Sequence, residues 1–201
     1  MSLRSIINIL PMISNLALAC TLACTLACAV GCGDSSAPKA DSKASTVADA
    51  TVPAGTFTNE QPAGAIGVIE ARKSAKLGER VVLLGRIGGT RAPFVSDLAI
   101  FSIIDSSLKS CVEGGDDDHC PRPWDYCCEE KSARSAAMAS IEIDGADGKP
   151  LAIALESEGT LKPLMLVAVE GTLQSTDGGS FVVRAQHIYK IPNDPLAKHI
   201  K

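Results

Sequence analysis

Short runs of β-branched and apolar residues recur along the chain from residue 80 onward, each bounded by glycine-rich or polar turns. They cover residues 80–87, 99–105, 139–144, 164–173 and 180–188. Runs of this length, rich in Val and Ile, are typical of strands rather than helices. Alternation should place Phe101 with Ile103, and Ile141 with Ile143, on buried faces, because every second side chain of a strand points the same way.

Glycines inside two of these runs indicate that the strands bend. Gly85 and Gly171 lie within their runs, where a glycine marks a bulge or a bend of a small barrel. Residues 177–179, Asp-Gly-Gly, should join the last two runs as a hairpin. Residues 151–155 fit a further strand and a helical turn equally well. The expected fold class is mainly β, a small barrel of five or six strands.

A short helix is expected before the first strand, in residues 66–76, where Val68 and Ala71 follow helical spacing. The order of this helix, a glycine-containing strand, a Phe-containing strand ending in Asp105, and three further strands resembles exported OB-fold proteins and the nucleic-acid-binding OB-fold groups. The resemblance covers roughly residues 68–189. The stretches that carry it are residues 81–86, 101–105 and 167–172. It implies an OB-like barrel with a Cys-rich insertion at residues 107–133.

The N-terminus has the layout of an export signal. Arg4 precedes an almost wholly apolar stretch, residues 6–30, and the chain becomes polar after Cys32. The small residues before Cys32 resemble the lipobox of bacterial lipoproteins. This resemblance implies cleavage before Cys32 and its acylation, palmitate included. The alternatives are an uncleaved transmembrane anchor, because the apolar run is long enough to span a bilayer, and a plain secretory signal.

All three alternatives place the body of the protein outside the cytoplasm, in the cell envelope on the periplasmic or outer-membrane side. We expect four parts along the chain. They are a lipoprotein signal peptide (residues 1–31), a flexible tether (residues 32–62), the OB-like domain (residues 63–192) and a C-terminal tail (residues 193–201). The tether is rich in Ser, Ala, Lys and Pro and has no apolar periodicity, so that it has nothing to bury.

Four cysteines lie in the insertion. They are Cys111, Cys120, Cys127 and Cys128. An even number in an exported protein predicts two disulfides, because thiols oxidise outside the cytoplasm. A bond between adjacent Cys127 and Cys128 would strain the backbone, so we expect Cys111 and Cys120 to pair with these two in either order. Prolines beside Cys120 favour a disulfide-stapled loop over a helix.

A metal site is the main alternative use of the insertion. The four cysteines together with His119 are ligands that zinc and copper prefer. Asp116, Asp117 and Asp118 offer oxygen ligands for calcium. The spacing contains no Cys-x-x-Cys pair and no EF-hand pattern, and adjacent cysteines rarely point at one ion. Thiol redox exchange is a further alternative. We expect no cofactor, with zinc, copper or calcium as the alternative.

Charge and aromatic content restrict the partner. The net charge is −4, and residues 113–130 contain seven acids against one base, Arg122. Nucleic acid is not an expected partner, because proteins that bind it concentrate Lys and Arg on one face. Aromatic residues make up only 3% of the chain, few for the base stacking of single-strand binders. Trp124 and Tyr126 fit either a small core against the cysteines or a partner contact.

The residues do not support catalysis, because no Ser-His-Asp set, phosphate-binding loop or carboxylate pair stands out in the sequence. The expected function is a non-catalytic OB-like binding or scaffolding module, anchored to the membrane through lipid, with an unknown envelope protein or small ligand as partner. One alternative is a metal-binding or thiol redox protein. Others are an OB barrel that binds single-stranded nucleic acid or an oligosaccharide, and haem binding through His187 and Tyr189, as in periplasmic haem chaperones.

Overall fold

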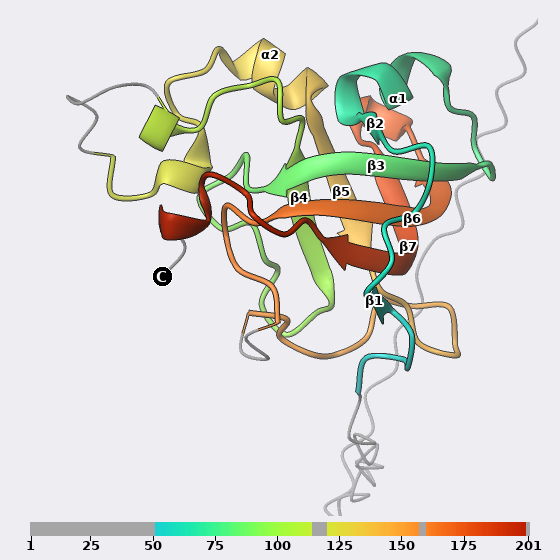
Figure 1. The fold of residues 1–201 in the computed structure, drawn as a ribbon. Helices are drawn as coiled ribbons and strands as arrows, with labels where there is room; N and C mark the ends of the chain where they lie inside the picture. Colours follow the sequence, from blue (N-terminus) through green and yellow to red (C-terminus); the bar gives the residue numbers. More distant parts are fainter. Residues whose placement is uncertain (1–50, 114–119, 157–159, 200–201) are drawn as a thin grey trace, which may run out of the picture. The chain divides into compact units, whose positions relative to one another are not determined.

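The structure, a computed structural model, describes residues 51–113, 120–156 and 160–199 (Figure 1). Five strands curl into a closed barrel. They are β3 (Arg80–Ile87), β4 (Ile100–Ile104), β5 (Met138–Glu142), β6 (Leu166–Ser175) and β7 (Val182–Lys190). The pairing runs β3–β4–β5–β7–β6, and β6 returns to β3. Only β5 and β7 pair in parallel within this ring. The mainly β fold class is confirmed, and the barrel is compatible with an OB-like fold.

Two further strands, which the sequence did not indicate, extend the sheet. β1 (Phe57–Thr58) pairs in parallel with β7, and β2 (Ile66–Gly67) pairs in parallel with β3. Thr56, immediately before β1, is buried, and its carbonyl accepts the Ile188 N–H at 2.6 Å. The last part of the stretch assigned to the tether therefore packs on the barrel.

The barrel interior is filled by the side chains that alternation placed there. Phe101 and Ile103 of β4 are 1% and 0% exposed, and Ile141 of β5 is fully buried, as predicted. The strongest apolar run, β6, buries Val167 and Val169. The other fully buried members of this cluster include Leu83, Ile87, Leu161, Leu173, Val183 and Ile188. Strands that are far apart in the sequence, such as β3 and β7, thus share one core.

Helix α1 (Val68–Ser74) packs on the barrel with Val68 and Ala71 fully buried. Its N-terminus is capped from a distance, because the Asp105 carboxylate accepts the Ile69 N–H at 2.9 Å. A β-carbon on Gly67 would lie 2.5 Å from an oxygen of that carboxylate, so a side chain at this position would displace Asp105. The aspartate that ends the second predicted strand therefore fixes the first helix.

The internal glycines have the expected role in the barrel. The register of β6 against β7 shifts between Glu170 and Gly171, which is a β-bulge. A β-carbon on Gly171 would lie 2.2 Å from the Arg184 carbonyl oxygen, so the two strands can approach only at a glycine. A β-carbon on Gly85 would lie 3.0 Å from the Ile103 side chain and from the Ile104 carbonyl.

Other segments differ from expectation or lie beyond the described residues. Residues 151–155, expected as a strand or a helical turn, form neither and run as a loop between β5 and β6. Residues 1–50, which include the predicted signal, most of the tether and Cys32, lie outside the described residues. In the ranges that the structure describes, no helix combines the length and the apolar character needed to cross a bilayer.

Candidate functional site

The Cys-rich segment, residues 107–133, connects β4 to β5 and contains more helix than its prolines indicated. The described parts hold two short 3₁₀ helices, η1 (Cys111–Glu113) and η2 (Pro123–Asp125), and lead into helix α2 (Lys131–Ala136). Pro123 stands at the start of η2, where its missing N–H leaves no hydrogen bond unmade and its fixed φ suits the helix. The expectation of a loop without helix was therefore wrong here.

Tyr126 attaches this segment to the barrel. Its side chain is fully buried and packs in a second apolar cluster with Ile104 and Ala137. Its φ of 55° is left-handed and ends η2. The Tyr126 hydroxyl has no hydrogen-bond partner among the described residues, and burial raises the pKa of the phenol above its ordinary value. Of the two alternatives for the aromatic residues, Tyr126 takes the core role.

The Gly88-Gly89 pair receives the segment at the end of β3. The Gly89 N–H donates to the Trp124 carbonyl at 2.8 Å. A β-carbon on Gly88 would lie 2.6 Å from that same oxygen and 3.3 Å from the Tyr126 ring. The sequence identified these glycines only as a strand boundary. Their second role, as the surface on which Trp124 and Tyr126 rest, needed the three-dimensional arrangement.

The cysteines gather their sulfurs into one cluster. The Cys127 Sγ lies 3.7 Å from the Cys111 Sγ and 3.5 Å from the Cys120 Sγ. The ligand atoms of Cys111, Cys127 and Cys128 all lie within 4.8 Å of one another. A disulfide needs about 2.05 Å between its sulfurs, so neither contact of Cys127 has the geometry of the predicted bonds. The Cys127 sulfur lies at similar distances from the Cys111 and Cys120 sulfurs, so these distances do not favour a Cys111–Cys127 bond over a Cys120–Cys127 bond.

The crowding of sulfurs has a chemical consequence at Cys127. Hydrogen bonding with the neighbouring Cys120 and Cys111 sulfurs raises the pKa of the Cys127 thiol to about 12, because these contacts favour its protonated form. Cys111 is buried, whereas Cys127 and Cys128 are exposed. The predicted oxygen and imidazole ligands Asp116, Asp117, Asp118 and His119 lie outside the described residues.

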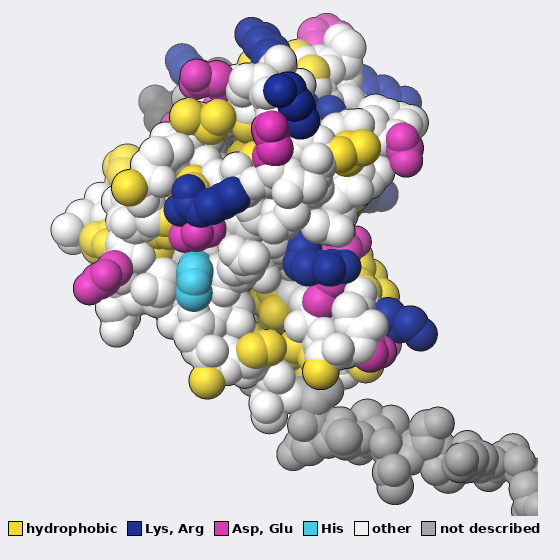
Figure 2. All heavy atoms as spheres, turned by 90° about the vertical axis from the view of Figure 1, so that its right-hand side faces the viewer, with side chains coloured by type: hydrophobic (Ala, Val, Ile, Leu, Met, Phe, Trp, Pro, Cys, Tyr) yellow, Lys and Arg dark blue, Asp and Glu magenta, His cyan; other side chains and the backbone are white. Residues whose placement is uncertain are grey.

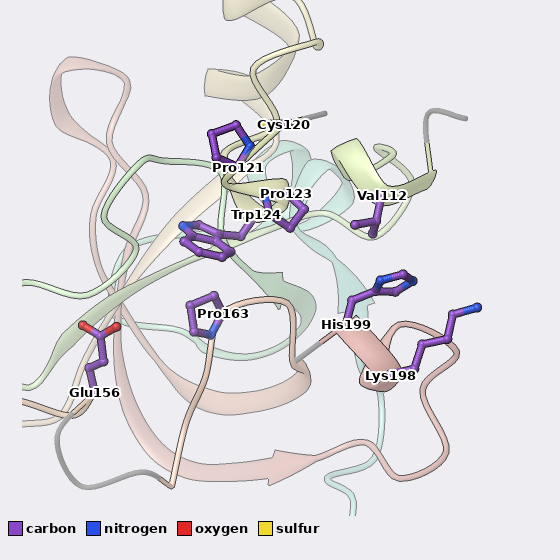
Figure 3. Close-up of a pocket in the computed structure, with 9 residues that line it drawn as sticks. All are labelled: Val112, Cys120, Pro121, Pro123, Trp124, Glu156, Pro163, Lys198 and His199. Carbon is purple, nitrogen blue, oxygen red and sulfur yellow. The ribbon is translucent and has the colours of Figure 1, made fainter. Parts of the chain in front are cut away.

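Beside the cluster lies a pocket of about 530 Å³ (Figure 3). Trp124 lines it, and in this view Pro121 and Pro123 lie above the indole ring and Pro163 lies below it. The Trp124 ring nitrogen donates to the Arg91 carbonyl at 3.2 Å, which fixes the plane of the indole. Trp124 is only partly buried, so that, unlike Tyr126, it keeps an accessible surface.

The two ends of the pocket carry opposite charges. Glu156 lies at one end, while Lys198 and His199 lie at the other (Figure 3). Both of the latter belong to η4 (Ala197–His199), in the stretch that the sequence treated as a C-terminal tail. No pattern in that short stretch indicated a binding role, because the residues join the pocket only through tertiary contacts.

A buried ion pair holds this C-terminal turn against the barrel. Arg86 of β3 pairs with both oxygens of Asp194, and the same guanidinium donates to the Leu164 carbonyl at 2.6 Å. The side chains of Arg86 and Asp194 are 8% and 4% exposed. Burial alone would raise the pKa of Asp194, but hydrogen bonds from Arg86 and from the Leu196 N–H outweigh it and hold that pKa below the ordinary Asp value.

The remaining sequence-predicted residues lie elsewhere on the barrel. His187 is exposed on β7, and its Nδ1 lies 3.0 Å from the Gly55 carbonyl oxygen. Tyr189 is partly buried on the same strand. Neither residue lines the pocket beside Trp124.

Comparison with known proteins assigns no family or function to this chain. No protein-family model matches the chain, and no curated protein matches its sequence. The site must therefore be interpreted from its own residues.

Proposed function

We propose that the protein is a non-catalytic binding module, held in the cell envelope by a lipid anchor on Cys32, and that it receives a ligand in the pocket beside Trp124, which the Cys-rich segment and neighbouring loops form on the barrel. The pocket carries the proposal. Its volume of about 530 Å³ falls in the range of small-molecule and peptide sites, which are mostly apolar with a few charged groups at defined places.

The chemistry of the pocket fits a short peptide segment of an envelope protein. The indole of Trp124 and the rings of Pro121, Pro123 and Pro163 offer an apolar surface. An indole contributes a large contact area at little entropic cost, which is why Trp is frequent at binding hot spots. Glu156 at one end and Lys198 of η4 at the other complement a ligand with both charges, such as a peptide.

The distribution of basic side chains supports the exclusion of polyanions. Three arginines of the barrel are paired with acids, Arg80 with Glu170, Arg86 with Asp194 and Arg184 with Asp144. On the face shown in Figure 2, Lys and Arg side chains lie next to Asp and Glu rather than gathering in one area. A nucleic-acid groove needs a continuous positive surface along the backbone.

The protein offers a direct readout of the pocket, because Trp124 is its single tryptophan. We would titrate the full chain in detergent with a short proline-containing peptide, an oligosaccharide and an oligothymidylate, following indole fluorescence. The proposal expects saturable change with the peptide. Saturation only with the oligosaccharide would show that the ligand is an oligosaccharide and not a peptide. Salt-dependent binding of the oligothymidylate would overturn the exclusion of nucleic acid.

Two single-residue variants test whether the peptide binds in this pocket. Calorimetry should show that Trp124→Ala weakens peptide binding by about 2 kcal/mol, the size expected for a central aromatic contact. Leu77→Ala is the control, because Leu77 is 58% exposed and does not line the pocket. Equal loss in both variants would show that the peptide binds elsewhere.

A further inference from the structure

The four cysteines of the Cys-rich segment converge from three separate stretches of chain. Cys111 comes from η1, Cys120 precedes η2, and Cys127 with Cys128 follows it. Cys127 contacts Cys111 at 3.7 Å and Cys120 at 3.5 Å, and Cys128 lies within 4.8 Å of both Cys111 and Cys127. The adjacent Cys127 and Cys128 thus both bring their sulfurs close to that of Cys111.

The two contacts of Cys127 are close to the edge length of a metal tetrahedron, and Cys120 joins the group of Cys111, Cys127 and Cys128 through its contact with Cys127. Zn–S bonds of about 2.3 Å in a tetrahedral site place neighbouring sulfurs about 3.8 Å apart. A disulfide would bring one partner of Cys127 to about 2.05 Å. Cys127 instead lies at 3.7 and 3.5 Å from two sulfurs, as a corner of a tetrahedron does.

The ligand type selects the ion. Thiolates favour soft or borderline ions such as Zn²⁺, whereas Ca²⁺ requires oxygen ligands. We propose that Cys111, Cys120, Cys127 and Cys128 bind one Zn²⁺ as a structural site with four protein ligands. Binding exchanges the four thiol protons for the ion, so protons are released to solvent and no electrons are transferred. With all four positions filled by protein, no open position remains for a substrate.

The zinc site would order one wall of the pocket. Cys120 lines the pocket and also contacts Cys127. One ion would therefore fix both ends of residues 120–127, the stretch that carries Trp124. The Arg134 guanidinium donates to the Tyr126 carbonyl at 3.1 Å, which places a positive charge beside Cys127 and offsets the negative charge of a four-thiolate site.

Metal content of the full chain tests this proposal. Elemental analysis of chain purified without chelator should give about one zinc per chain, as a closed structural site requires. Replacing zinc by Co²⁺ should produce the sulfur-to-cobalt charge-transfer absorption and the visible bands of a tetrahedral thiolate complex. Cys127→Ser and Cys111→Ser should each lose these bands. The control is Ser132→Ala, at an exposed position of the neighbouring helix α2, which should keep them.

A second measurement covers the case in which the cysteine variants do not fold. X-ray absorption of the zinc-containing wild-type chain reports the coordinating atoms directly, and the proposal expects a shell of sulfur alone. Metal-free wild-type chain whose four cysteines resist alkylation until reduction would overturn the proposal in favour of disulfides. A zinc shell dominated by oxygen or nitrogen would overturn it equally.

Discussion

Replacement of Asp194 by Asn should destabilise the barrel far more than the loss of an exposed ion pair. Asp194 and Arg86 are 4% and 8% exposed, and the carboxylate accepts from both guanidinium nitrogens. Asp194→Asn leaves the Arg86 charge buried without its counter-ion. Removing one partner of a buried pair costs about 3 to 5 kcal/mol, which corresponds to a fall of roughly 6 to 20 °C in Tm.

The matched control removes the acidic partner of Arg80, which lies on β3 like Arg86. Glu170→Gln breaks the pair with Arg80, but the Arg80 side chain is 58% exposed, so the loss should stay within about 1 kcal/mol. Urea unfolding followed by circular dichroism gives both free energies. The double variant Arg86→Met with Asp194→Leu should recover much of the stability, because it removes both charges. If Asp194→Asn costs no more than Glu170→Gln, the assignment of Asp194 as the buried anchor of the C-terminal turn is refuted.

Three further predictions follow from the same contacts. The pKa of Asp194 is depressed in the folded protein. Its contribution to the unfolding free energy should therefore be complete above the unfolded Asp pKa of about 3.9 and should be lost as the pH falls through the lower folded pKa. Unfolding free energies measured in acid should show this loss in wild type and not in Asp194→Asn. Gly171→Ala should cost about 1 to 3 kcal/mol, because the new β-carbon would lie 2.2 Å from the Arg184 carbonyl, whereas Gln174→Ala, exposed on the same strand, should change the unfolding free energy little; equal values would contradict the close approach. Tyr126→Phe should be neutral or stabilise by about 1 kcal/mol, because the buried hydroxyl has no partner among the described residues, and a loss above that size in the same assay would show a hydrogen bond to Tyr126.

The barrel was predictable because local pattern and tertiary role agree in its strands. Alternation identified the buried faces of β4 and β5, and the glycine inside β6 marked a bulge. The two-residue strands β1 and β2 were not predictable, because they are too short for any periodicity and owe their pairing to β7 and β3. Helix α2 was not predicted because the prolines before it disfavour a helix in the same segment, although Ala133 and Arg134 are good helix formers.

The site was predictable only in part. The concentration of cysteines and the single tryptophan led us to predict residues 107–133 as the region of specific chemistry, and the structure brings the sulfurs of Cys111, Cys127 and Cys128 together there. Trp124 lines a pocket, whereas Tyr126 fills a core. These different roles depend on which face of η2 meets Gly88, and residue spacing in the sequence does not indicate this face. Lys198 and His199 reach the pocket through the Arg86–Asp194 pair, a contact across 108 residues of sequence, which no local pattern reports.

The mass of the mature chain isolated from bacterial membranes tests the central claim most directly, since a binding module in the envelope requires export and anchoring. We predict that the mature chain begins at Cys32, that this residue carries acyl chains, and that Cys32→Ser leaves an unprocessed precursor. A wild-type chain that keeps residues 1–31, or that begins beyond Cys32 without lipid, would contradict the anchored envelope module.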